Sequence, residues 1–270
     1  MLAEYTGFFS RAALGNFGFR WLHILAGITW IGLLYFFNFV QVPEYAKFEN
    51  DPHKEIGGKA RLIAIDKVTR KALWWFRWAA LGTFLTGILI TGLIEGYYDA
   101  GVGADGAELS WGRFAGNIGI SAGMLLGTIM LLNVWGVIWR NQKVVLANAA
   151  NVLAGGEANP DAPAAGRRAV MASRQNLIFS VAMLYFMVFK SHHPYSGNPV
   201  EAGNLAVFWI ITMVLVVVME LNALGLLPWK TTANKGLNVL YDGKGIRNPL
   251  IAAFGFFAVM LILTEVLFKV

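Results

Sequence analysis

The segment FRWLHILAGITWIG, Phe19–Gly32, carries one arginine and one histidine in a run that is otherwise suited to lipid. It lies in a longer apolar stretch, and a helix needs roughly 20 mostly apolar residues to span a bilayer. The whole chain has the same character, because 57% of its 270 residues are hydrophobic and only 14% are charged. A soluble domain carries about 25% charged residues. The composition therefore predicts an integral membrane protein with several spans.

Six segments are long and apolar enough to be spanning helices, and they predict an all-α, polytopic membrane helix bundle in a single domain, 1–270. The spans are 17–40, 72–94, 114–139, 170–189, 204–223 and 249–268. The fourth is the weakest, because its most apolar part, Leu177–Phe189, is too short to span alone. It spans only if the polar stretch Ser173–Asn176 is drawn into the inner headgroup layer.

The basic residues are distributed unequally between the two sides. Eight fall around the first connection, five around the third and four around the fifth, against five on the opposite side. The positive-inside rule then places both termini outside, as in a multi-pass protein of the bacterial inner membrane. This placement accounts for the net charge of +6 without a nucleic-acid partner.

The chain contains no cysteine. This excludes disulfides, thiolate metal sites, iron–sulfur clusters and the covalent attachment of c-type haem. No phosphate-binding glycine loop, serine–histidine–aspartate arrangement or paired-carboxylate motif stands out. Any cofactor must therefore be held by other side chains.

Three of the four histidines are expected in the outer layer of the membrane. His23 lies about 9 Å inward from the start of the first span, at 1.5 Å per residue. The fourth span ends in KSHHP, Lys190–Pro194, and the helix should stop near His192 because the residue before a proline avoids helical geometry. His193 follows directly, whereas His53 lies in a polar connection and is expected to be solvated. The pattern predicts a metal or haem site, with hydrogen-bonded packing histidines as the alternative.

The first span has a face suited to a flat cofactor. His23, Gly27 and Trp30 share one side of a helix at spacings of four and three. Neutral imidazole is an axial ligand of haem iron, and it suits copper as well. Arg20 and Lys190 share the outer layer, where they either extend to headgroups or neutralise an anionic group.

The stretch RWLHILAGITWIG, Arg20–Gly32, resembles the first span in the membrane domain of the cytochrome c-coupled (PuuD-type) urate hydroxylases. The same pattern, Trp-Leu-His followed by Trp-Ile-Gly, also resembles HemJ-type protoporphyrinogen oxidases and CopD-type copper-resistance proteins. SHHP, Ser191–Pro194, resembles the Asn-His-aromatic-Pro motif of the urate hydroxylase group, with His192 as the matching histidine. Ser191 and His193 depart from that motif, and the cysteines of the group's C-terminal cytochrome c domain are lacking.

The resemblance implies a membrane oxidoreductase with haem b, acting on urate or another small oxidisable molecule. His23 and His192 would ligate the iron, with His193 as the rival ligand. Arg20 and Lys190 would neutralise haem propionates or an anionic substrate. Gly27 and Trp30 would pack against the ring, and an external cytochrome c would accept electrons.

Two other classes of function stay open. The chain can be a non-catalytic accessory subunit of a larger respiratory or oxygenase complex in the membrane. A transporter or copper-handling permease is less favoured, because transporters often carry their polar groups at mid-depth and this chain places them toward the two faces.

Two further features predict contacts between spans. Gly119, Gly123 and Gly127 form a row at spacings of four, which is typical of close helix packing in membranes. Glu220, near the inner end of the fifth span, is expected to form an ion pair with Arg77, with a role in a proton path as the alternative.

Overall fold

The computed structural model describes residues 7, 9–10, 13–94, 97–103, 106–242 and 245–269, without the side chains of Glu49, Lys54 and Glu55. It confirms the all-α class. Six helices are long and apolar enough to cross a membrane: Leu14–Phe48, Ile56–Leu93, Ala115–Leu153, Ala162–His192, Ala202–Ala223 and Arg247–Leu267. Each expected span falls on one of these helices to within one residue.

The three longest helices are built from consecutive segments. The first joins η1 (Leu14–Gly18), α2 (Phe19–Tyr35), η2 (Phe36–Gln41) and α3 (Val42–Glu49). The second joins α4 (Lys54–Ala64), η3 (Ile65–Thr69) and α5 (Arg70–Leu93), and the third joins α6 (Ala115–Leu132), η5 (Asn133–Ile138) and α7 (Trp139–Leu153). The remaining spans are α8 (Ala162–His192), α9 (Ala202–Ala223) and α10 (Arg247–Leu267).

Four of the short segments, η1, η2, η3 and η5, are π-helical turns inside the long helices. Three of them carry buried polar side chains, those of Asn38, Thr69 and Asn133, each 2% exposed. A π turn contains one extra residue and rotates the side chains that follow it. The turns are therefore located where polar groups face neighbouring helices.

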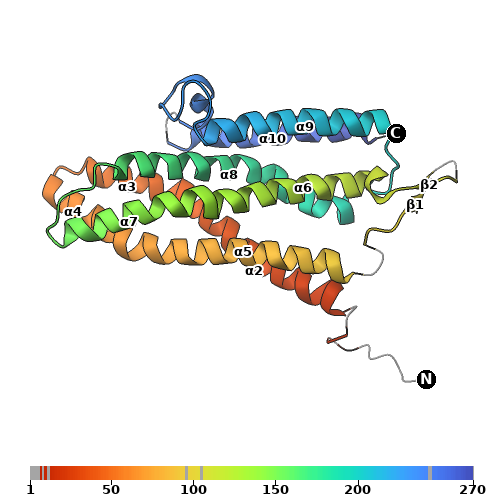
Figure 1. Ribbon diagram of the computed structural model, residues 1–270, viewed down its shortest axis with the longest axis horizontal. Coiled ribbons are helices and arrows are strands. Elements are labelled where there is room, and N and C mark those ends of the chain that lie inside the picture. The colour runs from red at the N-terminus through yellow and green to blue at the C-terminus, as the bar shows by residue number, and fades with distance from the viewer. Residues whose placement is uncertain are drawn as a thin grey trace.

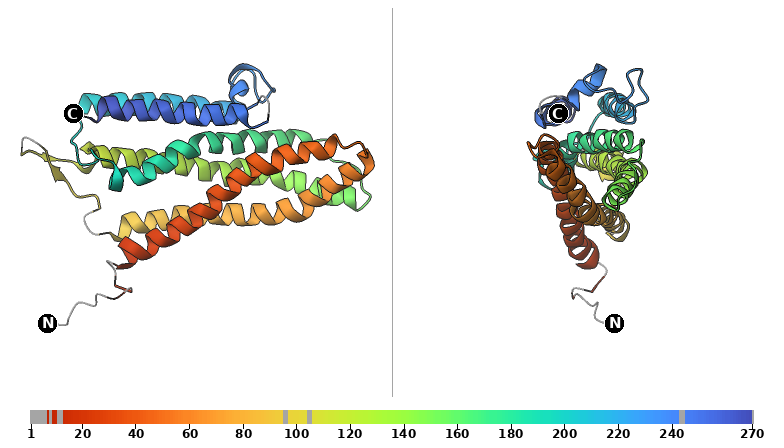
Figure 2. Two further views of the ribbon diagram at one scale, coloured as in Figure 1. Left: turned by 180° about the vertical axis from the view of Figure 1, so that it is seen from behind. Right: turned by 90° about the vertical axis from the view of Figure 1, so that its left-hand side faces the viewer.

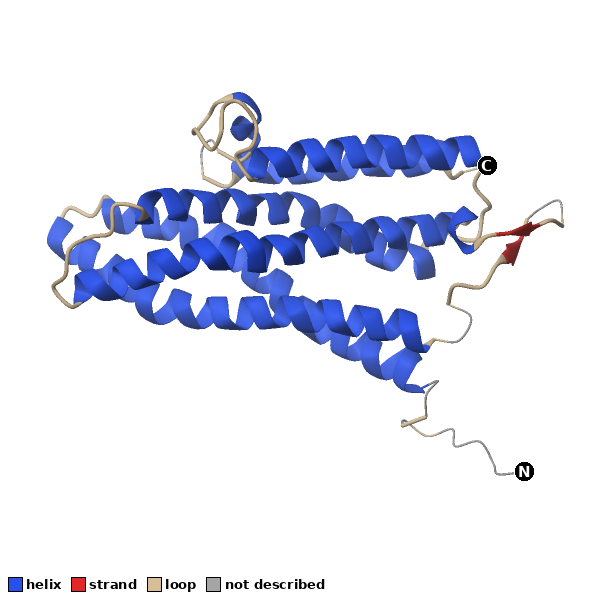
Figure 3. Ribbon diagram, viewed as in Figure 1, coloured by secondary structure: helices blue, strands red, loops and turns tan. Residues whose placement is uncertain are grey.

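The helices form layers. Figure 1 shows α9 and α10 lying along one side of α8 and the α6–α7 helix, with α2 and α5 on the opposite side. The reverse and end views show the same order (Figure 2). Figure 3 shows that the strands of the described residues form one small hairpin at one end, where β1 (Gly101–Val102) pairs with β2 (Glu108–Leu109). The beginning of α2 and the end of α10 lie at that same end of the bundle.

Helix α8 is the central helix, and it contacts α2, α6, α7, α9 and α10. The most apolar 18-residue window of α8 is 61% buried, against 17% in α9. Its polar residues Gln175, Asn176 and Ser180 are fully buried. The weakest span in hydropathy is thus surrounded by protein rather than lipid, which is where polar side chains in membrane helices usually face.

Neighbouring helices form hydrogen bonds with several of the polar groups of α8, although Gln175 Nε2 is buried without a partner. Asn176 Nδ2 donates to the Met130 carbonyl at 2.9 Å, and Asn176 Oδ1 accepts from Asn133 Nδ2 at 3.1 Å. Asn38 Nδ2 donates to Ser173 Oγ at 2.9 Å. These bonds tie α8 to both adjoining long helices.

The expected ion pair between Glu220 and Arg77 is not formed. Glu220 Oε2 accepts a hydrogen bond from Asn133 Nδ2 at 3.1 Å. The Arg77 guanidinium instead lies 3.9 Å from the ring centroid of Trp139. Arg77 therefore forms a cation–π contact in place of the expected ion pair. Its side chain points toward Trp139 on α7, not toward Glu220 on α9.

The glycine row packs α6 against α8, as expected. A Cβ at Gly123 would lie 3.1 Å from Phe186 Cβ and 3.3 Å from the Met187 backbone nitrogen. A Cβ at Gly119 would lie 2.7 Å from the ring of Phe189. The two backbones therefore approach at a distance that only glycine permits at these positions.

A buried ion pair stabilises the end of the bundle that lies opposite the β1–β2 hairpin. Arg167 Nη1 and Nη2 donate to the two Asp242 carboxylate oxygens at 2.6 and 2.9 Å, and the Asn234 backbone N–H donates to Oδ2 at 2.9 Å. Arg174 Nη1 donates to the Tyr241 carbonyl and lies 3.4 Å from Asp242 Oδ1. Burial alone would raise the pKa of Asp242. The hydrogen bonds from Arg167 and Asn234 and the charges of both arginines outweigh it and lower that pKa.

We expect Gly123→Ala to lower the free energy of unfolding by about 1–3 kcal/mol, because the Met187 backbone nitrogen cannot yield to the new methyl group. Gly255→Ala on α10 is the matched control, since a Cβ there meets nothing within 4 Å. Unfolding of the purified protein in detergent measures both. Equal stability of the two variants would contradict the close contact between α6 and α8.

We expect Asp242→Asn to destabilise the protein by about 3 kcal/mol, because it leaves two guanidinium groups without their carboxylate. In the wild type, the Asp242 carboxylate contributes fully to the free energy of unfolding above its unfolded-state pKa of about 3.9. This contribution is lost as the pH falls through its lower folded-state pKa. Thermal unfolding between pH 7 and pH 3 measures it. The exposed Asp161→Asn serves as control, and an identical acid profile for the two variants would refute this role for Asp242.

Candidate functional site

His23 is held by the interface between α2 and α5. Its Nδ1 lies 2.8 Å from the Thr83 carbonyl oxygen and 3.3 Å from Thr86 Oγ1. A carbonyl oxygen can only accept, so Nδ1 carries the proton and donates it. Nε2 then keeps its lone pair. Histidines that bind metals usually have this arrangement, with the second ring nitrogen donating to a carbonyl or carboxylate.

Small residues let the imidazole lie flat between the two helices. A Cβ at Gly87 would lie 3.3 Å from His23 Cε1, so any side chain there would press on the ring. A Cβ at Gly27 would lie 3.8 Å from Thr83 Cγ2, and one at Gly82 would lie 3.7 Å from Ala26 Cβ. Gly87 therefore leaves room for the imidazole, whereas at Gly27 and Gly82 a methyl group would make only ordinary contacts.

Helix α2 crosses the bundle obliquely. Its beginning lies beside the end of α5, and its second half reaches α8 (Figures 1 and 2). In that second half, Tyr35 Oη lies 3.1 Å from Ser180 Oγ. Trp30 precedes this contact and is 3% exposed, with its Nε1 lacking a hydrogen-bond partner. His23 therefore lies on the part of α2 that has diverged from α8.

The two histidines of the fourth span differ in their surroundings. Helix α8 ends at His192, as expected, and this side chain is exposed. The His193 ring stacks on Phe189 with centroids 4.2 Å apart and meets Tyr195 at 4.1 Å. Its Nδ1 is buried and lacks a partner. Tyr195 in turn donates to Glu265 Oε1 at 2.7 Å, which connects this cluster to α10.

His23 and His193 thus belong to separate clusters. The cluster of His23 lies between α2 and α5, and the cluster of His193 lies between α8 and α10. Within the part of the chain that the structure describes, no group of three or more histidine, aspartate or glutamate side chains is placed to hold a metal ion. Joint ligation by histidines of the first and fourth spans stays a prediction. His53 is exposed, as expected, with Nδ1 3.5 Å from Asp51 Oδ1.

Arg20 and Lys190 lie at the same end of the bundle as His23. Lys190 Nζ is 3.9 Å from the ring centroid of Tyr97 and 5.2 Å from that of Trp111. Burial and the neighbouring Tyr98 raise the pKa of Tyr97 to about 12, and the positive charge of Arg20 acts against this rise. Neither cation has a carboxylate within ion-pair distance among residues 13–94, 97–103, 106–242 and 245–269. Within these residues, aromatic rings rather than a carboxylate surround the Lys190 ammonium group.

The tyrosines beside Lys190 are site residues that the sequence analysis did not single out. Tyr97 and Tyr98 follow directly after the second span, and their rings lie 4.9 Å apart. An aromatic pair at the end of a span is also what an interfacial belt looks like. The sequence therefore did not indicate the contact between Lys190 and the Tyr97 ring.

No protein-family model, curated protein or solved structure matches the chain.

We expect His23 to be the Nδ1–H tautomer. In ¹⁵N nuclear magnetic resonance spectra of histidine-labelled protein without added cofactor, its Nδ1 should appear protonated and hydrogen-bonded, and Nε2 unprotonated. The solvated His53 provides the reference signal, and a His23→Ala variant assigns the resonance. A protonated Nε2 on His23 would contradict the orientation described here.

Proposed function

We propose that this chain is a membrane-bound redox protein that holds haem b near the end of the bundle where α2 begins. One observation carries the proposal: His23 donates through Nδ1 to Thr83 and keeps Nε2 as a free donor atom for iron. The backbone carbonyl of Thr83 holds the ring, and Gly87 leaves room for it on the facing helix. The residues present thus fit an axial imidazole ligand.

The remaining residues have distinct roles in this proposal. Arg20 and Lys190 offset the negative charge of haem propionates or of an anionic substrate, since both lack a carboxylate partner among the residues described. Gly27 faces Thr83 on α5, the residue whose carbonyl accepts the His23 hydrogen bond. When bound, haem supplies one-electron chemistry, and the protein sets its ligation and surrounding charge.

His192 and His193 are both candidates for a second ligand. His193 has a buried ring nitrogen without a partner, whereas His192 has the freedom of an exposed helix end. By its resemblance to urate hydroxylases, the protein would oxidise urate or another small molecule and pass electrons to an external cytochrome c. Copper is the alternative metal, because imidazole binds it equally well.

A second candidate is an accessory subunit of a larger membrane complex. Trp74, Trp75 and Trp78 on α5 are 42, 52 and 46% exposed, and Trp74 and Trp75 contact each other at 5.0 Å. Clustered tryptophans are frequent at protein interfaces. Copurification of a stable partner, with no cofactor bound to this chain, would favour this function over the first.

We expect the protein purified from its native membrane to show a haem absorption spectrum, and His23→Ala to lose most of the bound haem. Gly87→Val should weaken haem binding as well, because it displaces the imidazole. Quantitative haem and copper analysis accompanies the spectra.

His53→Ala and Gly92→Val are the matched controls, because His53 is solvated and a Cβ at Gly92 meets nothing within 4 Å. Size-exclusion profiles identify any variant that fails to fold. Full haem content in a folded His23→Ala protein, or no haem in the wild type, would refute the proposal.

A further inference from the structure

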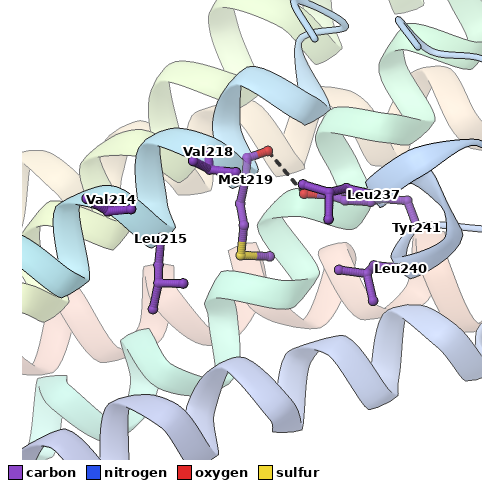
Figure 4. A pocket seen from close by; sticks show the side chains of 7 residues that line it. All are labelled: Val214, Leu215, Val218, Met219, Leu237, Leu240 and Tyr241. Carbon is purple, nitrogen blue, oxygen red and sulfur yellow. Dashed lines mark hydrogen bonds between the residues drawn. The ribbon is translucent and has the colours of Figure 1, made fainter. Parts of the chain in front are cut away.

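An apolar groove lies at the end of the bundle opposite His23. It has a volume of about 330 Å³ and is lined by Val214, Leu215, Val218, Met219, Leu237, Leu240 and Tyr241. Figure 4 shows that four of these side chains come from α9 and three from η6 (Gly236–Leu240) and the residue after it. The four on α9 share one helix face, at spacings of one, four and five residues.

The walls of the groove are fixed by buried hydrogen bonds. The Tyr241 hydroxyl donates to the Gln175 side-chain oxygen and, at 3.1 Å, contacts the Met219 carbonyl (Figure 4). Asn238 Nδ2 donates to the carbonyls of Lys230 and Thr232 at 2.9 and 2.8 Å. The only polar group of the lining side chains is thus already engaged, and the groove keeps an apolar surface in a preformed shape.

The exposed charges beside the groove are positive. Among the described residues between α9 and α10, the charged ones are Lys230, Lys235 and Asp242. Asp242 is 6% exposed and is neutralised by Arg167, whereas both lysines are exposed. Lysines at a membrane boundary attract anionic lipid headgroups, each by a contribution of about 1 kcal/mol.

The size of the groove selects among possible occupants. A helix with its side chains is about 10 Å across, so only side chains on its surface would enter the groove. A hydrocarbon chain is narrower and meets only apolar atoms here. Its headgroup would lie at the boundary, within reach of flexible lysine side chains.

We infer that the groove between α9 and η6 binds one acyl chain of an anionic phospholipid, whose headgroup is held by Lys230 and Lys235. This site is independent of the proposed haem site, which lies at the other end of the bundle. The lipid links α9 to the connection that also carries Asp242. It therefore stabilises the part of the fold where α9 and α10 join α8.

Native mass spectrometry of the detergent-purified full chain, titrated with phosphatidylglycerol or phosphatidylcholine, tests the inference. We expect one tightly bound phosphatidylglycerol and weaker binding of phosphatidylcholine. Leu215→Trp fills the groove from α9, and Leu240→Trp fills it from η6, so each should abolish this site. Lys230→Gln and Lys235→Gln should each reduce the preference for phosphatidylglycerol, by roughly fivefold per lysine.

Ile210→Trp and Lys143→Gln are the matched controls, because Ile210 is exposed on α9 outside the groove and Lys143 is exposed on α7. Both should bind lipid as the wild type does. Equal affinity for the two lipids, or unchanged binding in both groove-filling variants, would overturn the inference. So would a dimer that dissociates in those variants, because a second copy would then be the occupant.

Discussion

The burial of α8 is the constraint on which the rest of the structure depends. This helix carries Gln175, Asn176 and Ser180 without exposing them, and each such group would be costly in lipid. The first, third, fifth and sixth spans contact it, and Asn133 and Met130 satisfy Asn176. The layers of the bundle follow from this requirement, since α9 and α10 must cover one side of α8 and the long helices the others.

The same constraint separates the two halves of the first helix. The polar partners of α8 on the first helix, Tyr35 and Asn38, lie in its second half. Its first half is released from α8 and packs on α5, where Gly87 leaves room for the His23 ring. His23 lies in this released half, with one ring nitrogen fixed by Thr83 and the other free.

Much of the fold could be predicted from the sequence. Apolar length located five spans directly and the fourth with its polar stretch included, and the proline after His193 located the end of α8. Hydropathy misjudged the importance of the fourth span, because it measures suitability for lipid and α8 faces protein. The ion pair between Arg167 and Asp242 could not be predicted, because no sequence pattern links two residues that are 75 positions apart.

The candidate site was predictable only in part. The sequence placed His23 beside Gly27 on one helix face, but the partner Thr83 lies on another helix, 60 residues away. Depth along a span is readable from sequence, whereas the direction in which a side chain points around the bundle is not. His23 and His193 are accordingly in separate clusters, although both lie in the layer that depth indicated.

The most direct measurement of the central claim is an electron-density or cryo-electron microscopy map of the protein purified from its native membrane. The account predicts a flat density beside α2, continuous with His23 Nε2, with Nδ1 still donating to the Thr83 carbonyl. A map in which Nε2 of His23 donates to a protein group, or faces lipid with no ligand density, would contradict it.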